Sequence, residues 1–93
     1  MATMHNPPHP GEILREWLGE MSVTDAAQRL GDARTTLSRV LNGSSDILAD
    51  MALRLQAAFG TSPEMWMGLQ DDNELWLAAK NKRPRIASFP LAA

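Results

Sequence analysis

Apolar side chains recur every three or four positions along most of this chain, and no stretch alternates apolar and polar residues as a half-buried strand would. The first apolar stripe follows His9-Pro10-Gly11-Glu12, where Pro10 suits the first position of a helix. The members of this stripe are Ile13, Leu14, Trp17, Leu18 and Met21. The pattern predicts a first helix that turns this stripe toward a core.

Capping residues and glycines divide the next part of the chain into two short helices. Ser22 suits the N-cap of the first of them, with Asp25 three residues later, and Gly31 suits its end. The second is expected from about Ala33 to Asn42-Gly43, because Asn-Gly favours a stop. The residues expected inside are Ala26, Ala27, Leu30, Ala33, Leu37, Val40 and Leu41.

Two further helices follow a short polar loop at residues 44–48. One is expected over Ala49–Phe59, ending at Gly60 and burying Ala52, Leu55 and Phe59. The other begins with Ser62 as cap and Pro63 at its first position, and could run to Lys80. Its apolar side is formed by Trp66, Leu69, Trp76 and Leu77. Segment 81–93 has two prolines and no periodicity, so we expect a tail there.

Composition narrows the classes of protein to consider. A chain of 93 residues has room for one domain. It contains no cysteine, which excludes disulfides and thiolate metal sites. Residues 1–10 do not resemble a signal peptide and no apolar run is long enough to span a bilayer, so we expect a cytoplasmic protein without membrane contact.

Neither catalysis nor cofactor binding is expected. The chain has no glycine-rich phosphate loop and no nucleophile elbow, so we predict that it is not an enzyme. His5 and His9 have the four-residue spacing of metal ligands on one helix face, but Pro7, Pro8 and Pro10 forbid a regular helix there. We therefore expect no metal site.

Charge is unevenly distributed along the chain, although the net charge is only −2. Residues 28–45 carry a net charge of +2, and residues 80–85 (KNKRPR) carry +4, while residues 1–27 and 46–79 are acidic. A local basic block matters more for nucleic-acid binding than the sum over the chain. The basic segment 80–85 is interpreted either as an arm that binds phosphates or as an exposed, soluble tail.

The first of these blocks coincides with a helix-turn-helix pattern over residues 23–42. Two short amphipathic helices joined by a glycine-containing turn, about twenty residues in all, are typical of this DNA-binding motif. The second helix would display hydrogen-bonding side chains and two guanidinium groups, which suit base edges and phosphates. The candidate DNA-binding residues are Arg34, Thr35, Thr36, Ser38, Arg39 and Asn42, with Thr24 and Gln28 on the preceding helix. A solvated basic helix face is the alternative interpretation.

Several ordered blocks resemble the HigA family of antitoxins, within the phage-repressor-like helix-turn-helix class. These are HPGEIL at 9–14, the helix-turn-helix core, LSRVLNG at 37–43, ADMALRL at 49–55 and GTSPEMWMGLQ at 60–70. The resemblance covers roughly residues 9–80. It implies an all-α, five-helix domain that dimerises, represses its own operon and binds a ribosome-dependent toxin that cleaves mRNA.

The sequence departs from the family pattern at four places near the motif. Val23 and Thr35 stand where the family usually has polar residues, often glutamine, and Ala33 stands where a serine commonly caps the recognition helix. Ser44-Ser45-Asp46 follows Asn-Gly where Lys or Arg is frequent. Since each lost cation removes about one phosphate contact, we expect weaker and less salt-sensitive DNA binding than in a typical member.

The predicted organisation is a flexible segment 1–8, a helix-turn-helix domain 9–80 that ends in a dimerisation helix, and a tail 81–93. The candidate dimer interface is Trp66, Leu69, Trp76 and Leu77, although these side chains could instead cover the core. A twofold homodimer would bind a palindromic operator in double-stranded DNA. The acidic row Glu12, Glu16 and Glu20 is either a solvated face or a docking surface for a basic toxin.

Three functions therefore remain open. The first is a sequence-specific DNA-binding antitoxin that neutralises a cognate mRNA-cleaving toxin and represses its own operon. The second is an orphan transcription regulator without a toxin. The third is a protein-interaction module that has lost strong DNA binding.

Overall fold

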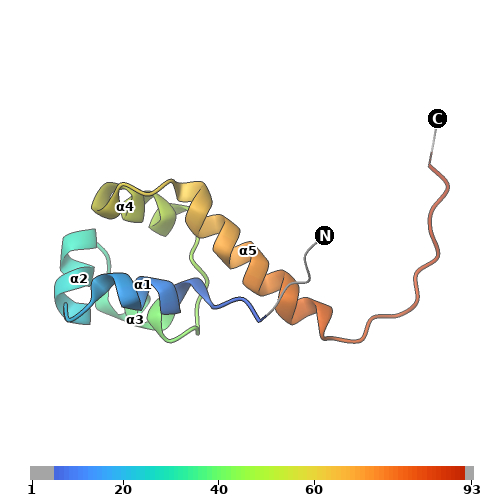
Figure 1. The fold of residues 1–93 in the computed structure, drawn as a ribbon, viewed down its shortest axis with the longest axis horizontal. Coiled ribbons are helices and arrows are strands. Elements are labelled where there is room, and N and C mark those ends of the chain that lie inside the picture. Colours follow the sequence, from blue (N-terminus) through green and yellow to red (C-terminus); the bar gives the residue numbers. More distant parts are fainter. Residues whose placement is uncertain (1–5, 92–93) are drawn as a thin grey trace.

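A computed structural model describes residues 6–91 of the chain and contains five α-helices and no strand in that range. They are α1 (Pro10–Leu18), α2 (Val23–Leu30), α3 (Arg34–Leu41), α4 (Ala49–Phe59) and α5 (Pro63–Ala79). The first four gather into one body, and α5 runs out from it toward the tail (Figure 1). The predicted all-α, five-helix fold is confirmed.

Helix ends follow the local signals in the sequence. Ser22 Oγ accepts a hydrogen bond from Asp25 N–H at 3.1 Å, and Ser62 Oγ accepts one from Met65 N–H at 3.1 Å. Gly31 ends α2 in the left-handed region at φ 71°. These predicted caps are confirmed, because a cap depends on side chains and backbone within one turn.

His9 caps α1, whereas the sequence interpretation considered this residue only as a metal ligand. Its Nδ1 accepts from Gly11 N–H at 2.9 Å, while its own N–H donates to the Glu12 carboxylate at 3.1 Å. This reciprocal pair is a capping box with histidine in the place of serine. His5, its proposed companion, lies outside the described residues.

The core is small and consists mainly of aliphatic side chains from all five helices. Its fully buried members include Leu14, Leu37, Leu55 and Trp66. Ile47 is also fully buried, although the sequence interpretation placed residues 44–48 in a polar loop. Tertiary packing turns this one side chain inward between α3 and α4.

Four residues expected inside are exposed instead, and one of them is Trp17, which lies in the last turn of α1 and is 44 % exposed. Ala33 is the extended N-cap of α3 and lies outside its inner face. Phe59 ends α4 and is 37 % exposed, with its ring edge-on to Trp17 at 5.4 Å. Met21 lies beyond the end of α1, which stops at Leu18, and is 40 % exposed. Helical periodicity does not hold at these positions, because each lies at or beyond a helix end.

The segment after α5 leaves the body of the protein. Residues 81–91 contain no helix or strand and are exposed, and they extend away from α1–α4 (Figure 1). Within residues 6–91 no helix is long and apolar enough to cross a membrane.

Candidate nucleic-acid interface

Helices α2 and α3 form the helix-turn-helix that the sequence predicts. Gly31 N–H donates to Gln28 O at 3.1 Å, and Asp32 N–H donates to Ala27 O at 3.0 Å, so the turn satisfies the carbonyls at the end of α2. Ala26 and Ala27 are buried in the core with α3 residue Leu37. The short turn and these small side chains allow α3 to pack closely against α2.

Arg54 of α4 fixes the same turn from outside the motif. Its Nη1 donates to Leu30 O at 2.7 Å and to Gly31 O at 2.8 Å, and its Nε pairs with Asp50 at 2.8 Å. The hydrogen bond and charge of Asp50 raise the pKa of Arg54 above its ordinary value. A cation on the last carbonyls of α2 also suits the helix dipole. Sequence reasoning missed this role, although the Asp50–Arg54 spacing of four residues could have indicated the pair.

The outer face of α3 carries the predicted recognition residues. Arg34, Thr35, Thr36, Arg39 and Asn42 are exposed, and Ser38 is half-buried. Within residues 6–91 the sole ion pair is Arg54–Asp50, so neither arginine of α3 is neutralised by a carboxylate there. The structure thus gathers six candidate residues on one accessible helical surface.

Two side chains from neighbouring helices join this surface. Arg34 Nε donates to Thr24 Oγ1 at 3.1 Å, which brings the predicted α2 residue Thr24 to the start of α3. Arg15 Nη2 of α1 lies 3.5 Å from Asn42 Oδ1, at the other end of α3. Gln28 is exposed on α2. Arg15 was not among the predicted site residues, because in the sequence it belongs to an acidic segment.

The C-terminal end of α3 rests directly on the start of α1. A Cβ added at Gly11 would overlap Val40 O and stand 2.9 Å from Val40 C, so only glycine permits this approach. The His9 ring lies beside Gly43, which has φ 76°. The position of the recognition helix is therefore set by backbone contact as well as by the core.

The loop after α3 is fixed by Gln70 of α5, which is buried. Gln70 Oε1 accepts from Ile47 N–H at 2.8 Å, and its Nε2 donates to Asp46 Oδ1 at 3.1 Å and Glu74 Oε1 at 3.3 Å. A hydrogen bond with Asp46 and the charge of that residue raise the pKa of Glu74. Sequence reasoning missed Gln70, although its position four residues after Trp66 places it on the buried face.

The start of α3 and the loop after it contain two of the departures from the family pattern, Ala33 and Ser44-Ser45-Asp46. Ala33 makes no side-chain cap bond at the N-terminus of α3. The amides of Ser44 and Ser45 both donate to Arg39 O, at 2.9 and 3.2 Å. These two amides therefore close α3, and Asp46 is held by Gln70.

The four residues proposed for the dimer interface do not lie together at the surface. Trp66 is fully buried, with its ring edge-on to Trp17 at 5.3 Å and its Nε1 donating to Thr61 Oγ1 at 2.8 Å. Its place in that list is corrected, because the protomer itself covers it. Leu69 and Trp76 are half-buried, and Leu77 is 50 % exposed.

The sequence also singled out a row of acidic residues on the first helix and considered a metal site. Glu12, Glu16 and Glu20 are all exposed, and Glu12 is engaged in the cap of α1. Within residues 6–91 no group of three His, Asp or Glu side chains is arranged to hold a metal ion.

Comparison with known proteins places the motif in a family. A helix-turn-helix family model matches residues 12–66. The antitoxin HigA-1 of Vibrio cholerae is 36 % identical over 90 residues, covering 94 % of this chain and 84 % of that one.

Two solved structures share both fold and sequence with this chain. An addiction module antidote protein of the HigA family from Coxiella burnetii has a TM-score of 0.79 and 44 % identity, with 82 % of this chain and 86 % of that chain covered. The Pseudomonas aeruginosa antitoxin HigA, solved with the higBA promoter, has a TM-score of 0.74 and 41 % identity, covering 77 % and 82 %.

Proposed function

We propose that this chain, which belongs to the HigA family of helix-turn-helix antitoxins, binds operator DNA through α3, represses its own operon and neutralises an mRNA-cleaving toxin. The observation that carries the DNA-binding part is the exposed face of α3, where Arg34 and Arg39 stand among hydroxyl and amide side chains. The similarity to a HigA solved with its promoter supports the same assignment.

The geometry of Arg34 suits base recognition. Thr24 holds its Nε, which leaves the terminal nitrogens of the guanidinium for the O6 and N7 atoms of guanine. A held guanidinium loses less conformational entropy when it binds than a free one. We therefore assign Arg34 to a base edge. Thr24 acts by positioning it.

Arg39 and Arg15 extend the cationic surface toward the other end of α3. Arg39 is exposed one turn and a half beyond Arg34, and Arg15 approaches Asn42 from α1. Guanidinium groups spread along a helix in this way suit phosphates on both sides of a groove. We infer that Arg15 belongs to the DNA-binding set together with the residues predicted from the motif.

Dimerisation is proposed through α5, in a changed form of the sequence prediction that keeps Trp76 and Leu77, leaves out Trp66 and adds Leu75. Leu75 and Leu77 are 61 % and 50 % exposed on its C-terminal half, beside half-buried Trp76. A second copy packed about a twofold axis against the side of α5 that carries Trp76 and Leu77 would bury these two side chains and present two α3 helices to a palindromic site.

We expect this chain to bind operator DNA less strongly than a typical member of the family. The Ser44 and Ser45 amides already donate within the protein and are not free for a phosphate. Asp46 adds a negative charge close to where phosphates would lie. We expect fewer phosphate contacts and a shallower dependence of affinity on salt than in members with basic residues there.

The decisive experiment measures binding to the DNA upstream of this gene against scrambled DNA at several salt concentrations. Arg34→Ala and Arg39→Ala should each weaken specific binding by roughly 1–3 kcal/mol. Arg29→Ala, which removes the same charge from an exposed position on α2 outside the α3 face, is the matched control and should change specific binding less. Equal binding by all three variants and the wild type would refute the recognition face.

The toxin is tested separately, by co-expressing the reading frame beside this gene. A small basic protein that arrests growth alone, and that is neutralised by this chain and copurifies with it, is the expected result. Exposed Glu16 and Glu20 offer a surface for such a partner. DNA binding without any toxin would support the orphan regulator instead. Toxin binding without preference for the upstream DNA would support the protein-interaction module.

A further inference from the structure

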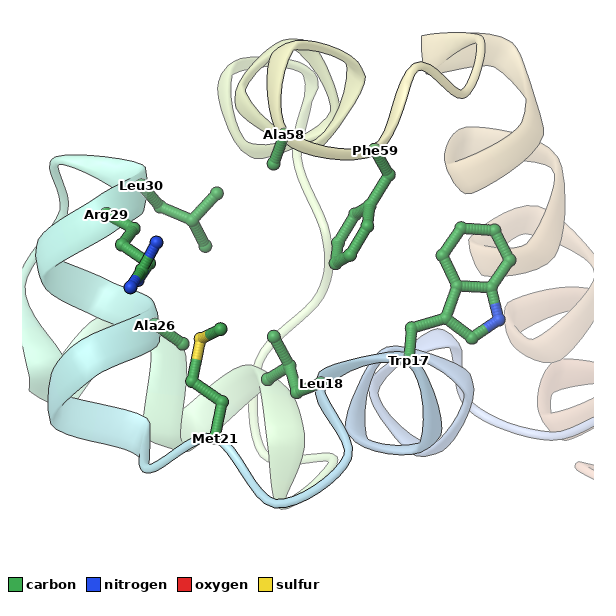
Figure 2. Close-up of a pocket in the computed structure, with 8 residues that line it drawn as sticks. All are labelled: Trp17, Leu18, Met21, Ala26, Arg29, Leu30, Ala58 and Phe59. Atoms are coloured by element: carbon green, nitrogen blue, oxygen red, sulfur yellow. The ribbon is translucent and has the colours of Figure 1, made fainter.

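An open apolar pocket lies between α1, α2 and α4, and neither the core nor the α3 face accounts for it. Its volume is about 180 Å³, and its wall includes Trp17, Leu18, Met21, Leu30 and Phe59. Figure 2 shows Leu18, Met21, Leu30, Ala58 and Phe59 around a common space, with Trp17 at its edge beside Phe59. Trp17, Met21 and Phe59 remain 44 %, 40 % and 37 % exposed. Exposed apolar side chains gathered around one hollow form a candidate contact surface for a partner.

The same chain carries an apolar segment that has nothing to pack against. Ile86, Phe89 and Leu91 are 72 %, 80 % and 92 % exposed in the extended segment after α5. The pocket is large enough for a ring, since a cavity of about 150 Å³ accommodates benzene. Pocket and segment are therefore complementary in size and polarity.

Charge also favours this pairing. Glu16 on α1, Glu20 in the turn after α1 and Asp25 on α2 are exposed and close in sequence to residues of the pocket wall. The wall itself contains one cation, Arg29. In the segment, Arg83 is engaged with Ala78 O at 2.8 Å. Arg85 is exposed directly before Ile86 and Lys82 is exposed four residues before it, so these two positive charges precede the apolar residues.

Position decides which copy supplies the segment. Helix α5 and the segment after it run away from α1, α2 and α4, so the segment leaves its own pocket behind (Figure 1). Extended chain advances about 3.3 Å per residue, so residues 81–91 reach roughly 30 Å. That reach carries the segment beyond its own α1–α4 body, where a second copy can meet it.

We propose that residues 82–91 of one copy dock into the Trp17–Phe59 pocket of a second copy, with Phe89 in the hollow and Lys82 and Arg85 beside Glu16 and Glu20. The docked segment lies on the side of α2 away from the α3 face, so a dimer closed in this way keeps its DNA-binding surface free. Docking requires a second copy but not a toxin, so it is tested on the purified chain alone. Because it uses Glu16 and Glu20, a toxin that binds these residues would compete with the docked segment.

The test uses the absence of cysteine from the full-length chain. Two single-cysteine variants, Ser88→Cys and Ala58→Cys, are purified separately with tags of different size, mixed and oxidised. Ser88 neighbours the docking residue Phe89, and Ala58 lies in the wall of the pocket. We expect a mixed disulfide dimer that forms roughly tenfold faster than with Gln56→Cys, because docking raises the local thiol concentration. Gln56 is exposed on the same helix outside the pocket and is the matched control.

A second variant isolates the docking side chain. Phe89→Ser in the Ser88→Cys chain should reduce crosslinking to the level of the Gln56→Cys control, without affecting folding, because Phe89 is 80 % exposed. Equal rates at positions 58 and 56, or no effect of Phe89→Ser, would overturn the proposal. An intramolecular disulfide in a chain that carries both Ser88→Cys and Ala58→Cys would also overturn it, since the occupant would then be the protein's own segment.

The α5 interface is monitored in parallel with Leu77→Cys, which lies on the exposed face of that helix. Self-crosslinking at position 77 without crosslinking between 88 and 58 would refute docking while the α5 dimer stands. The reverse result would support docking and refute the α5 interface.

Discussion

Gly11→Ala offers a sharp test of how α1 supports the recognition helix. Gly11 occupies the first turn of α1, where its backbone lies against the Val40 carbonyl at the end of α3. Helix propensity favours alanine over glycine by roughly 0.5–1 kcal/mol. The tertiary contact opposes the change, so the two effects have opposite signs.

The structure indicates which effect is larger. An added Cβ would overlap Val40 O and lie 2.9 Å from Val40 C, whereas ordinary contact begins at 3.4 Å. The obstacle is backbone, which cannot rotate away, so α1 and α3 must separate by at least half an ångström. Around them Leu14, Leu37 and Val40 are essentially fully buried, and overpacking of such a core costs about 1–3 kcal/mol. We therefore expect net destabilisation.

Thermal unfolding measures this directly. The overpacking cost of about 1–3 kcal/mol, less about 0.5–1 kcal/mol of helix propensity, corresponds to a decrease in Tm of up to roughly 20 °C for a domain of this size. Specific DNA binding should weaken in the same variant, because α3 shifts relative to α1. Gly68→Ala is the matched control: Gly68 lies within α5 with no atom within 4 Å of an added Cβ, so it should raise stability by about 0.5–1 kcal/mol. A Gly11→Ala protein as stable as wild type would refute the argument that this contact positions α3.

Two further predictions concern contacts outside the motif. Arg54→Met should lower the Tm and speed amide exchange in the α2–α3 turn, because Leu30 O and Gly31 O lose their charged donor; unchanged exchange there would contradict the positioning role. Asp46 raises the pKa of Glu74 above 4.5, so the Glu74 carboxyl binds its proton more tightly in the folded state than in the unfolded state. Protonation of Glu74 therefore stabilises the fold at low pH, and this stabilisation is lost as the pH rises through the folded pKa. Glu74→Gln should therefore raise the denaturant midpoint at pH 7 and leave it nearly unchanged at pH 3, and an equal shift at both values would refute the carboxyl pairing.

The sequence determined most of the helix boundaries. Ser22, Ser62 and Gly31 act through hydrogen bonds and backbone conformation within a single turn, so their effect does not depend on the rest of the fold. The polar face of α3 was also readable, because helical periodicity separates Arg34 and Arg39 from the buried Leu37 and Leu41.

Tertiary structure decided the residues whose role depends on a distant segment. Arg15 reaches Asn42 across 27 positions, Arg54 reaches Leu30 across 24, and Gln70 reaches Ile47 across 23. Periodicity indicates which face of a helix is buried, but it does not identify the distant polar group with which a side chain on that helix forms a hydrogen bond. The sequence alone therefore could not identify these three contacts.

The aromatic residues show the same division between local and distant effects. From its apolar stripe alone, Trp66 was equally suited to a core or to a dimer interface, and Phe59 was expected inside. In the structure Trp17 lies between their rings, so Trp66 is fully covered and Phe59 stays partly open beside the pocket. Periodicity along the chain determined that these side chains lie on apolar faces. The packing of α1 against α4 and α5 decided which of them is enclosed, because burial depends on the atoms that other helices bring to each position.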